Sequence, residues 1–404
     1  MLMLRRRSER ANGGSGGESM SRDTVVGLFA GIGGIEVGLH QAGFRTELLC
    51  EVDPDAQRVL SHHFAGVPVV ADVRELRAIP PVEIVTAGFP CQDLSQAGKT
   101  AGIAGKHSGL IGEVFRLLAR PNGAPRWLLL ENVPFMLQLH KGHAMRVLIS
   151  ALEDRGYTWA YRIVDARAFG LPQRRQRVIV IASRSEDPRE ILFHGSEAEP
   201  ERADADKVAC GFYWTEGLKG LGWAIDAVPT LKGGSSIGIP SPPAIRMPYD
   251  RTIVTPEIRD AERLQGFKAD WTLPAVHDER RRNGPRWRLV GNAVSVPVAA
   301  WLGERLRNPV RYDAARDRLL PKGAPWPHAA WGKSGRIYRA DLSTWPVRRD
   351  YQHLDEFLEY PPMPLSERAT AGFLSRARAS TSLRFPKGFK RDVASHLRRM
   401  RGLP

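Results

Sequence analysis

The sequence predicts an α/β protein: a doubly wound, mostly parallel sheet, followed along the chain by a smaller, irregular domain. Between residues 24 and 184, short apolar runs alternate with longer amphipathic segments, which is the pattern of β-α-β units. After residue 184 this alternation stops, and residues 185–256 are rich in Gly, Pro and Ser. With 404 residues, of which 42% are hydrophobic, the chain is long enough for two or three domains.

The elements of the sheet are expected in alternation along the chain. Each expected strand is a short apolar run, and each expected helix carries apolar residues at helical spacing. We expect strands at 24–29, 47–51, 67–70, 84–86, 127–130, 157–164 and 178–182, and helices at 34–42, 54–63, 110–119 and 143–155. Two later helices are expected at 261–266 and 294–306. In such sheets, ligands bind at the carboxyl ends of the strands.

The charge balance of the chain points to a polyanionic partner. Lys and Arg number 59 against 44 Asp and Glu, a formal net charge of +15. This surplus is typical of proteins that bind nucleic acid, although a basic tail on an unrelated enzyme would give the same total. The three cysteines, Cys50, Cys91 and Cys210, do not suggest a disulfide framework, so a cytoplasmic protein is expected. No apolar run is long enough to span a bilayer, so no membrane partner is expected.

Three features in strand order predict a cofactor that contains adenosine. The first strand runs into a glycine-rich turn at 29–34, where the backbone can approach a ligand closely. The second strand ends at Glu51, Val52 and Asp53, where an acid can bond ribose hydroxyls. The third strand is followed by Asp72, a candidate partner of the adenine amino group. These features leave NAD and S-adenosylmethionine open, and each acid alone also fits a solvated loop.

A candidate reaction centre follows at the ends of the next strands. The fourth strand leads into Cys91 within a Gly/Pro loop, where a thiolate can act as a nucleophile, although a lone cysteine is more often a small buried hydrophobe. The fifth strand ends at Glu131, whose carboxyl group can hold or donate a proton on a ring nitrogen. Arg175 and Arg177 alternate at the edge of the last strand, so both are expected to face the site, although a solvated strand end has the same pattern.

These blocks, in this order, resemble the DNA cytosine-carbon-5 methyltransferases of the kind found in bacterial restriction–modification systems. The resemblance covers residues 22–307, and its most specific pieces are Pro90-Cys91-Gln92, Glu131-Asn132-Val133 and Gln173/Arg175/Arg177. The other matching pieces are the turn at 29–34, Glu51, Asp72, Arg263-Leu264-Gln265-Gly266-Phe267 and Gly291-Asn292-Ala293-Val294. The resemblance implies methyl transfer from S-adenosylmethionine to carbon-5 of a cytosine flipped out of duplex DNA, on a Rossmann-like methyltransferase sheet.

The resemblance also implies roles for individual residues. Cys91 would attack carbon-6 of the cytosine, Glu131 would bond ring nitrogen N3 and the amino group, and Arg175 and Arg177 would orient the base. The implied cofactor-binding residues are Phe29, Ala30, Gly31, Gly33, Gly34, Glu51, Val52, Asp72, Val73, Pro90, Leu110, Asn292 and Ala293. The implied DNA-binding residues are Gln92, Ser95, Lys232, Arg246 and Arg251. The product would be S-adenosylhomocysteine, and no metal is expected.

Composition and resemblance together divide the chain into six segments. They are a disordered basic tail (1–21), the catalytic and cofactor-binding domain (22–184), a target-recognition region (185–256), a hinge (257–290), a helix returning to the catalytic domain (291–307) and a basic C-terminal extension (308–404). The composition of the extension fits extra DNA contact and packing equally well. We expect a monomer that acts on double-stranded DNA, alongside a cognate restriction endonuclease for the same sequence.

Three alternatives stay open on the sequence. A tRNA cytosine-5 methyltransferase would share the core, but the long irregular region favours duplex DNA, and the chain lacks the Cys-Phe-Thr tripeptide of the tRNA enzymes. A Rossmann dehydrogenase has no use for Cys91, Glu131 and the paired arginines together. An inactive DNA-binding relative is disfavoured because every expected catalytic residue is present. The sequence departs from the family at His107, where an arginine is usual, which puts one DNA or structural contact in question.

Overall fold

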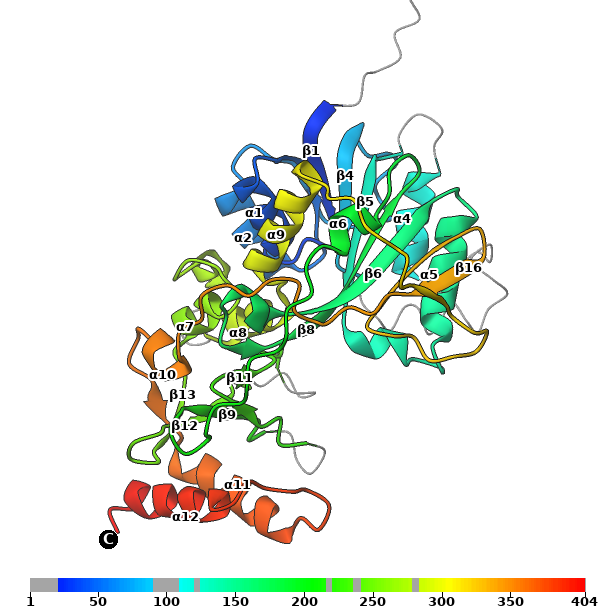
Figure 1. Ribbon diagram of the computed structural model, residues 1–404. Helices are drawn as coiled ribbons and strands as arrows, with labels where there is room; N and C mark the ends of the chain where they lie inside the picture. The colour runs from blue at the N-terminus through cyan, green and yellow to red at the C-terminus, as the bar shows by residue number, and fades with distance from the viewer. Residues whose placement is uncertain are drawn as a thin grey trace, which may run out of the picture.

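The computed structural model describes residues 21–89, 109–119, 124–215, 220–234, 241–277 and 283–403, and the structural statements below concern these residues. Its largest unit is a ten-stranded sheet with the order β14-β16-β15-β6-β8-β5-β4-β1-β2-β3 (Figure 1). The predicted doubly wound α/β fold is confirmed, with a parallel arrangement of its first five strands. The expectations for residues 1–20 and for Pro90, Cys91, Gln92, Ser95 and His107 lie outside the described residues.

One half of the sheet is parallel and consists of the first five expected strands. β1 (Ser21–Leu28) lies between β2 (Arg45–Cys50) and β4 (Val82–Ala87), and β3 (Val69–Val70) and β5 (Trp127–Asn132) extend the sheet on either side. β5 is buried along its whole length, as expected for a parallel strand covered on both faces. Because these strands are parallel, their carboxyl ends lie at one edge of the sheet.

The other half of the sheet is antiparallel. β8 (Gln176–Ser183) runs antiparallel to both β5 and β6 (Thr158–Asp165), and β15 (Ala329–Lys333) continues the sheet beside β6. β16 (Arg336–Arg339) and β14 (Arg318–Leu319) complete it. The last three strands come from residues 308–404, so part of this segment belongs to the catalytic sheet.

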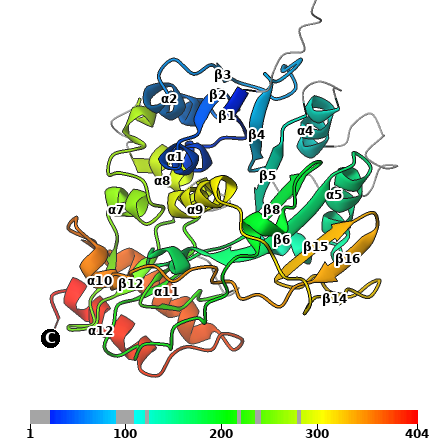
Figure 2. The same ribbon diagram turned by 45° about the horizontal axis from the view of Figure 1, so that its top comes forward.

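Helices cover both faces of the sheet. α1 (Gly34–Gln41), α2 (Pro54–His63) and α9 (Val296–Arg307) lie on one face, and α4 (Leu110–Leu118) and α5 (His143–Glu153) lie on the other (Figure 2). Successive residues of β5 alternate between the two layers: Leu128 and Leu130 pack with α4 and α5, whereas Leu129 packs with α1 and α9. The short helix α6 (Arg189–Leu192) also packs into the core, so the irregular region starts later than residue 185.

The six expected helices begin within three residues of their predicted positions, whereas α6, α8 and the helices after residue 350 were not expected. α1, α2, α4 and α5 start at the expected residues, α7 (Ile258–Arg263) starts three residues before the expected position, and α9 starts two residues later than expected. One of the helices that were not expected is α8 (Asn283–Asn292), whose first turn contains Gly284 and Pro285. Proline is tolerated in the first turn of a helix, and Trp287 and Val290 anchor this one in the core.

A second, five-stranded antiparallel sheet forms the small domain. Its order is β10 (Ala224–Ile225), β9 (Cys210–Phe212), β12 (Ala244–Arg246), β13 (Ile253–Thr255) and β17 (Met363–Pro364). β11 (Val228–Pro229) pairs with β7 (Gln173–Arg174) and so joins this domain to the catalytic domain. Three helices complete the small domain: α10 (Leu354–Phe357), α11 (Glu367–Ala379) and α12 (Phe389–Met400). The small domain therefore draws on two segments that are distant in the sequence.

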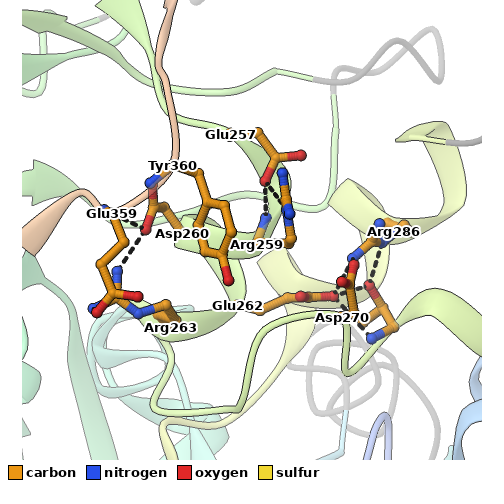
Figure 3. Close-up of polar contacts among 10 residues, drawn as sticks. Glu257, Arg259, Asp260, Glu262, Arg263, Asp270, Arg286, Glu359 and Tyr360 are labelled. Carbon is orange, nitrogen blue, oxygen red and sulfur yellow. Dashed lines mark hydrogen bonds and ion pairs between the residues drawn. The ribbon is translucent and has the colours of Figure 1, made fainter.

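A buried charge network stabilises the segment between the domains (Figure 3). Arg286, which is 2% exposed, lies 3.0 Å from a carboxylate oxygen of Glu262 and 2.9 Å from one of Asp270. Glu262 also accepts hydrogen bonds from the hydroxyl and backbone N–H of Thr272. Buried charges are costly unless they are paired and hydrogen-bonded, so this network favours a single conformation of the segment.

The C-terminal segment is attached to α7 by a second set of polar contacts. Asp260 accepts hydrogen bonds from the backbone N–H groups of Glu359 (3.1 Å) and Tyr360 (3.0 Å). Arg263 forms ion pairs with Asp260 and Glu359, as Figure 3 shows. These bonds explain why β17 can pair with β13 although about 100 residues separate them.

Among the described helices, none is both long and apolar enough to cross a bilayer.

A close contact between α1 and α9 supplies a first prediction. A Cβ on Gly38 of α1 would lie 2.5 Å from the Cβ of Ala299 and 2.5 Å from the backbone nitrogen of Ala300 in α9. We therefore expect Gly38→Ala to lower the free energy of unfolding by about 1–3 kcal/mol, measured by urea denaturation. The matched control is Gly372→Ala in α11, where the nearest atom is the flexible Arg376 side chain at 3.4 Å. It should leave stability unchanged or raise it by about 1 kcal/mol, and equal losses in both variants would contradict the packing argument.

Candidate active site

The ends of β1, β4 and β5 meet at one point. Ala87 of β4 lies opposite Leu130 of β5, so Gly88 and Glu131 follow side by side. A Cβ placed on Gly88 would lie 3.7 Å from a carboxylate oxygen of Glu131 and 3.7 Å from the carbonyl oxygen of Phe29. The register of the parallel strands thus brings three parts together: the glycine-rich turn, Glu131 and Gly88, which precedes residues 90–108.

Glu131 forms a buried ion pair with Arg177. The carboxylate is 8% exposed, and its Oε1 lies 2.7 Å from Nε of Arg177. The pair forms because β8 runs antiparallel beside β5, with Val178 opposite Asn132. Burial lowers the pKa of Arg177, and the nearby Glu131 carboxylate partly offsets that effect. The ion pair holds one carboxylate oxygen and leaves the other beside Gly88.

Asn132 holds the chain just before the expected nucleophile. Its side-chain amide donates a hydrogen bond of 3.0 Å to the carbonyl of Phe89, and its Oδ1 accepts one from the backbone N–H of Val133. Phe89 is itself buried in the core below the sheet edge. Asn132, the residue after Glu131, therefore holds Phe89, which comes two residues before Cys91.

The glycine-rich turn and Glu51 form one hydrogen-bonded unit. Glu51 accepts a bond of 2.7 Å from the backbone N–H of Gly31 and one of 2.9 Å from that of Asp53. Gly31 and Gly33 have positive φ angles of 57° and 82°, which glycine adopts without strain. Burial raises the pKa of Glu51. Beside it, Val52 is 68% exposed, which leaves an apolar side chain free to pack against a ligand ring.

The third expected cofactor acid is already paired. Asp72 forms an ion pair with Arg74, which holds the pKa of its carboxyl group at about 2. Val73, which follows it, is buried in the core. Binding of adenine to the Asp72 side chain would thus compete with Arg74. Leu110 is half-buried at the first turn of α4 and packs on the same core.

The segment that contains Asn292 and Ala293 contacts the glycine-rich turn through Val294. A Cβ on Gly34 would lie 2.3 Å from the carbonyl oxygen of Val294, so the two segments are in direct contact. Arg175, which lies between β7 and β8 and is buried, donates hydrogen bonds to the carbonyl oxygens of Gly291, Ala293 and Leu231. We expected Arg175 and Arg177 to face the site together. In the structure Arg177 meets Glu131, whereas Arg175 contacts main chain and positions the 291–293 segment.

Two side chains near the cofactor end, Arg288 and Glu36, were not predicted from the sequence. Arg288 of α8 forms ion pairs with Asp53 and Asp55 at the start of α2, and it was missed because α8 was not expected. Glu36 of α1 is 1% exposed and accepts a hydrogen bond of 2.8 Å from the hydroxyl of Thr86. Its other carboxylate oxygen has no partner among the described residues. A charged residue within an apolar helix face next to the glycine-rich turn was the available signal for Glu36.

The expected DNA-binding residues differ in their surroundings. Lys232 lies over the ring of Tyr213 at 4.0 Å, and Arg251 lies 3.4 Å from a carboxylate oxygen of Asp206. Arg246 is 3% exposed and forms ion pairs with Asp206 and Asp392. A DNA contact by Arg246 is inconsistent with this burial, because its guanidinium is used inside the small domain. In the described part of the chain, no group of three or more His, Cys, Asp or Glu side chains could hold a metal ion.

Burial of Glu36 supplies a pH prediction. Burial raises the pKa of this carboxyl from its ordinary 4.5 to about 7, so the folded state favours the protonated form. The resulting stabilisation is fully present below pH 4.5 and is lost as the pH rises to about 7, a change of about 3 kcal/mol. Glu36→Gln keeps a neutral side chain and should lose less stability between pH 5 and 8 than the unmodified chain, measured by denaturant unfolding.

The matched control is the exposed Glu75. Glu75→Gln should reproduce the pH dependence of the unmodified chain. If Glu36→Gln does the same, Glu36 is charged in the folded protein and the assigned shift is wrong.

Comparisons with known proteins identify relatives over most of the chain. The sequence model of the C-5 cytosine-specific DNA methylases matches residues 24–221. The chain is 50% identical to the Type II methyltransferase M2.BsuMI of Bacillus subtilis (strain 168) over 374 residues, which cover 90% of this chain and 96% of that protein. It is 30% identical to the Type II methyltransferase M.NlaX of Neisseria lactamica over 314 residues, which cover 70% and 96%.

A solved structure shows the same fold. The Dnmt2 methyltransferase of S. pombe superposes with a TM-score of 0.51 at 16% identity, covering 70% of this chain and 98% of that one. The alignment with M2.BsuMI is longer than residues 1–307, so it includes part of the segment 308–404.

Proposed function

The chain belongs to the C-5 cytosine-specific DNA methylases, and from this premise we propose that it methylates carbon-5 of a specific cytosine in duplex DNA through a covalent bond to Cys91. The observation that carries this mechanism is the convergence of Glu131, the glycine-rich turn and Gly88 at one sheet edge. A carboxyl group, a cofactor turn and the start of a cysteine loop are the parts that the reaction needs within reach of one base.

The chemistry requires a nucleophile because carbon-5 of cytosine is unreactive. Addition of the Cys91 thiolate to carbon-6 makes carbon-5 enamine-like, so that it can take up a methyl group. Loss of the carbon-5 proton to a base and elimination then release Cys91. The other two cysteines are unsuited, because Cys50 and Cys210 are buried and burial raises their pKa values to about 12 and about 11. Thiols with raised pKa values form little thiolate at neutral pH.

Glu131 recognises and activates the flipped base. Arg177 occupies one carboxylate oxygen, which leaves the oxygen beside Gly88 to meet N3 and the exocyclic amine. Proton transfer at N3 stabilises the charge that the thiolate addition creates. Flipping the base costs a few kcal/mol, which phosphate contacts to the basic protein can offset.

Methyltransferases of this family use S-adenosylmethionine, which supplies an electrophilic methyl group when bound. The residues present fit it: the positive-φ glycines admit close backbone approach, Glu51 can accept from ribose hydroxyls, and exposed Val52 can pack on the adenine. Asp72 would accept a hydrogen bond from the adenine amino group after its ion pair with Arg74 has opened. Asn292 and Ala293, held by Arg175, would close the pocket from the other side.

The biological role follows from the relatives named Type II methyltransferases. We assign the chain the modification step of a restriction–modification system, in which a cognate endonuclease cuts the same unmethylated sequence. The target-recognition region at 185–256 would read the target, and the enzyme would act as a monomer.

Removal of the thiol is the most direct test. Cys91→Ala should abolish methyl transfer to duplex DNA, because no other group can add to carbon-6, while DNA binding is retained. The measurement is bisulfite sequencing of a plasmid after expression, and Cys210→Ser is the control that keeps activity. Methylation by the Cys91→Ala enzyme at the unmodified rate would refute covalent catalysis. Parallel assays on tRNA decide between the two nucleic-acid substrates.

The carboxyl group of Glu131 supplies a further prediction. Glu131→Gln should lower kcat by at least ~100-fold, because a positioned acid contributes that much or more. Gln176→Ala, on the exposed neighbour of Arg177, is the control and should leave kcat unchanged. An unchanged single-turnover rate in Glu131→Gln would remove Glu131 from the reaction.

A further inference from the structure

More than half of the excess positive charge of the chain lies in its last 40 residues. Residues 365–404 contain ten Lys and Arg against two Asp and Glu, a surplus of eight within a chain whose net charge is +15. The ten cations are Arg368, Arg376, Arg378, Arg384, Lys387, Lys390, Arg391, Arg398, Arg399 and Arg401, which we call the C-terminal basic surface. All but Lys390 are exposed.

Both helices of this region present an apolar face inward. Phe373 and Leu374 of α11 and Phe389 and Val393 of α12 are buried against the small sheet around Phe212. These positions recur at helical spacing, so the basic residues are left on the opposite face. Because the apolar faces are already covered by the protein, insertion of either helix into a membrane surface is excluded.

Polar bonds attach the helices to the small sheet. Asp392 of α12 forms a buried ion pair with Arg246 of β12 (3.1 Å), so this acid does not neutralise the outer face. His396 accepts a hydrogen bond at Nδ1 from the backbone N–H of Ile253 and donates one from Nε2 to the carbonyl of Leu365. α11 and α12 are therefore an integral part of the small domain.

The outer face has few carboxylate partners. Arg401 pairs with Glu367 at 2.8 Å, and Arg391 lies 3.9 Å from Asp392. Among the described residues, no carboxylate lies within ion-pair distance of the five other exposed cations that make no backbone bond, Arg368, Arg378, Arg384, Lys387 and Arg398. A surface of unpaired guanidinium and ammonium groups is suited to a polyanion.

The surface is continuous with the expected target-recognition region. Arg399 donates a hydrogen bond of 2.8 Å to the carbonyl of Asp250, in the turn between β12 and β13. Arg376 donates one of 2.9 Å to the carbonyl of Trp214, at the end of the β9 segment. Figure 1 shows α11 and α12 side by side, beyond the small sheet as seen from the catalytic domain.

From this placement we propose that the C-terminal basic surface binds the phosphate backbone of duplex DNA beside the methylated site. The proposal rests on the proposed function, since it needs DNA to lie across the small domain. α12 has 12 residues and is about 18 Å long. Backbone phosphates lie about 3.4 Å apart along each strand, so the helix matches about five base pairs. A protein partner is disfavoured because the outer face lacks the aromatic core typical of stable interfaces.

The test variant removes five exposed cations that make no ion pair shorter than 3.9 Å: Arg378, Arg384, Lys387, Arg391 and Arg398, each changed to Gln. Two duplexes are compared, one limited to the target and a few flanking base pairs and one extended by about 15 base pairs on each side. Binding is measured as a function of salt. We expect affinity for the long duplex to fall at least ~10-fold and the slope of log K against log salt to shrink by roughly 2–4, since each lost phosphate contact contributes about 0.9. Affinity for the short duplex and kcat on it should stay unchanged.

Two matched controls separate local contact from net charge and from misfolding. The first changes five exposed arginines in or near the edge strands β14 and β16 of the catalytic sheet to Gln: Arg311, Arg316, Arg318, Arg336 and Arg339. It should leave both duplex affinities near the unmodified values. The second changes the arginines of the test set to Lys and should retain affinity for the long duplex, because lysine also binds phosphate.

The outcomes are distinguishable. An unchanged salt slope in the test variant overturns the proposal and is the result expected if the surface instead binds a protein. Equal losses in the test variant and the first control also overturn it, because net charge alone would then explain the effect. Failure of the unmodified protein to methylate the short duplex would instead contradict the proposed function.

Discussion

The register of three parallel strands is the constraint on which the active site depends. β1, β4 and β5 end at the same level, so the glycine-rich turn, Gly88 and Glu131 meet although about 100 residues separate the first from the last. A shift of one residue in the pairing of β5 with β4 would turn Glu131 toward the opposite face of the sheet. The packed core resists such a shift, because every side chain of β5 is buried and would have to repack against the opposite layer of helices.

Arginines connect the remaining parts of the site to this sheet edge. Arg177 is paired with Glu131, Arg175 bonds three backbone carbonyls of the adjoining segments, and Arg288 ties α8 to the start of α2. Guanidinium groups suit these positions because one side chain offers five donors in a fixed plane. The cofactor end is thereby closed by a segment that begins about 230 residues after the acids it contacts.

The small domain is built from both sides of the returning helix α9. β9, β12 and β13 precede that helix, whereas β17, α11 and α12 follow it and bring more than half of the net positive charge to the small domain. The same C-terminal segment first adds three strands to the catalytic sheet. The segment therefore connects the two domains. In α11 and α12, one face packs on the small sheet and the opposite face carries the basic residues.

The sequence by itself determined the α/β class, the order of the core strands and helices, and the residues at the strand ends, because apolar periodicity and glycine turns are local signals. Tertiary structure alone decided which of two alternating arginines meets Glu131, that Arg246 is buried, and that the C-terminal segment joins both sheets. Alternation tells which residues share a face, but not which neighbour covers that face. Pairing between segments more than 100 residues apart depends on the packed core, and no local pattern encodes it.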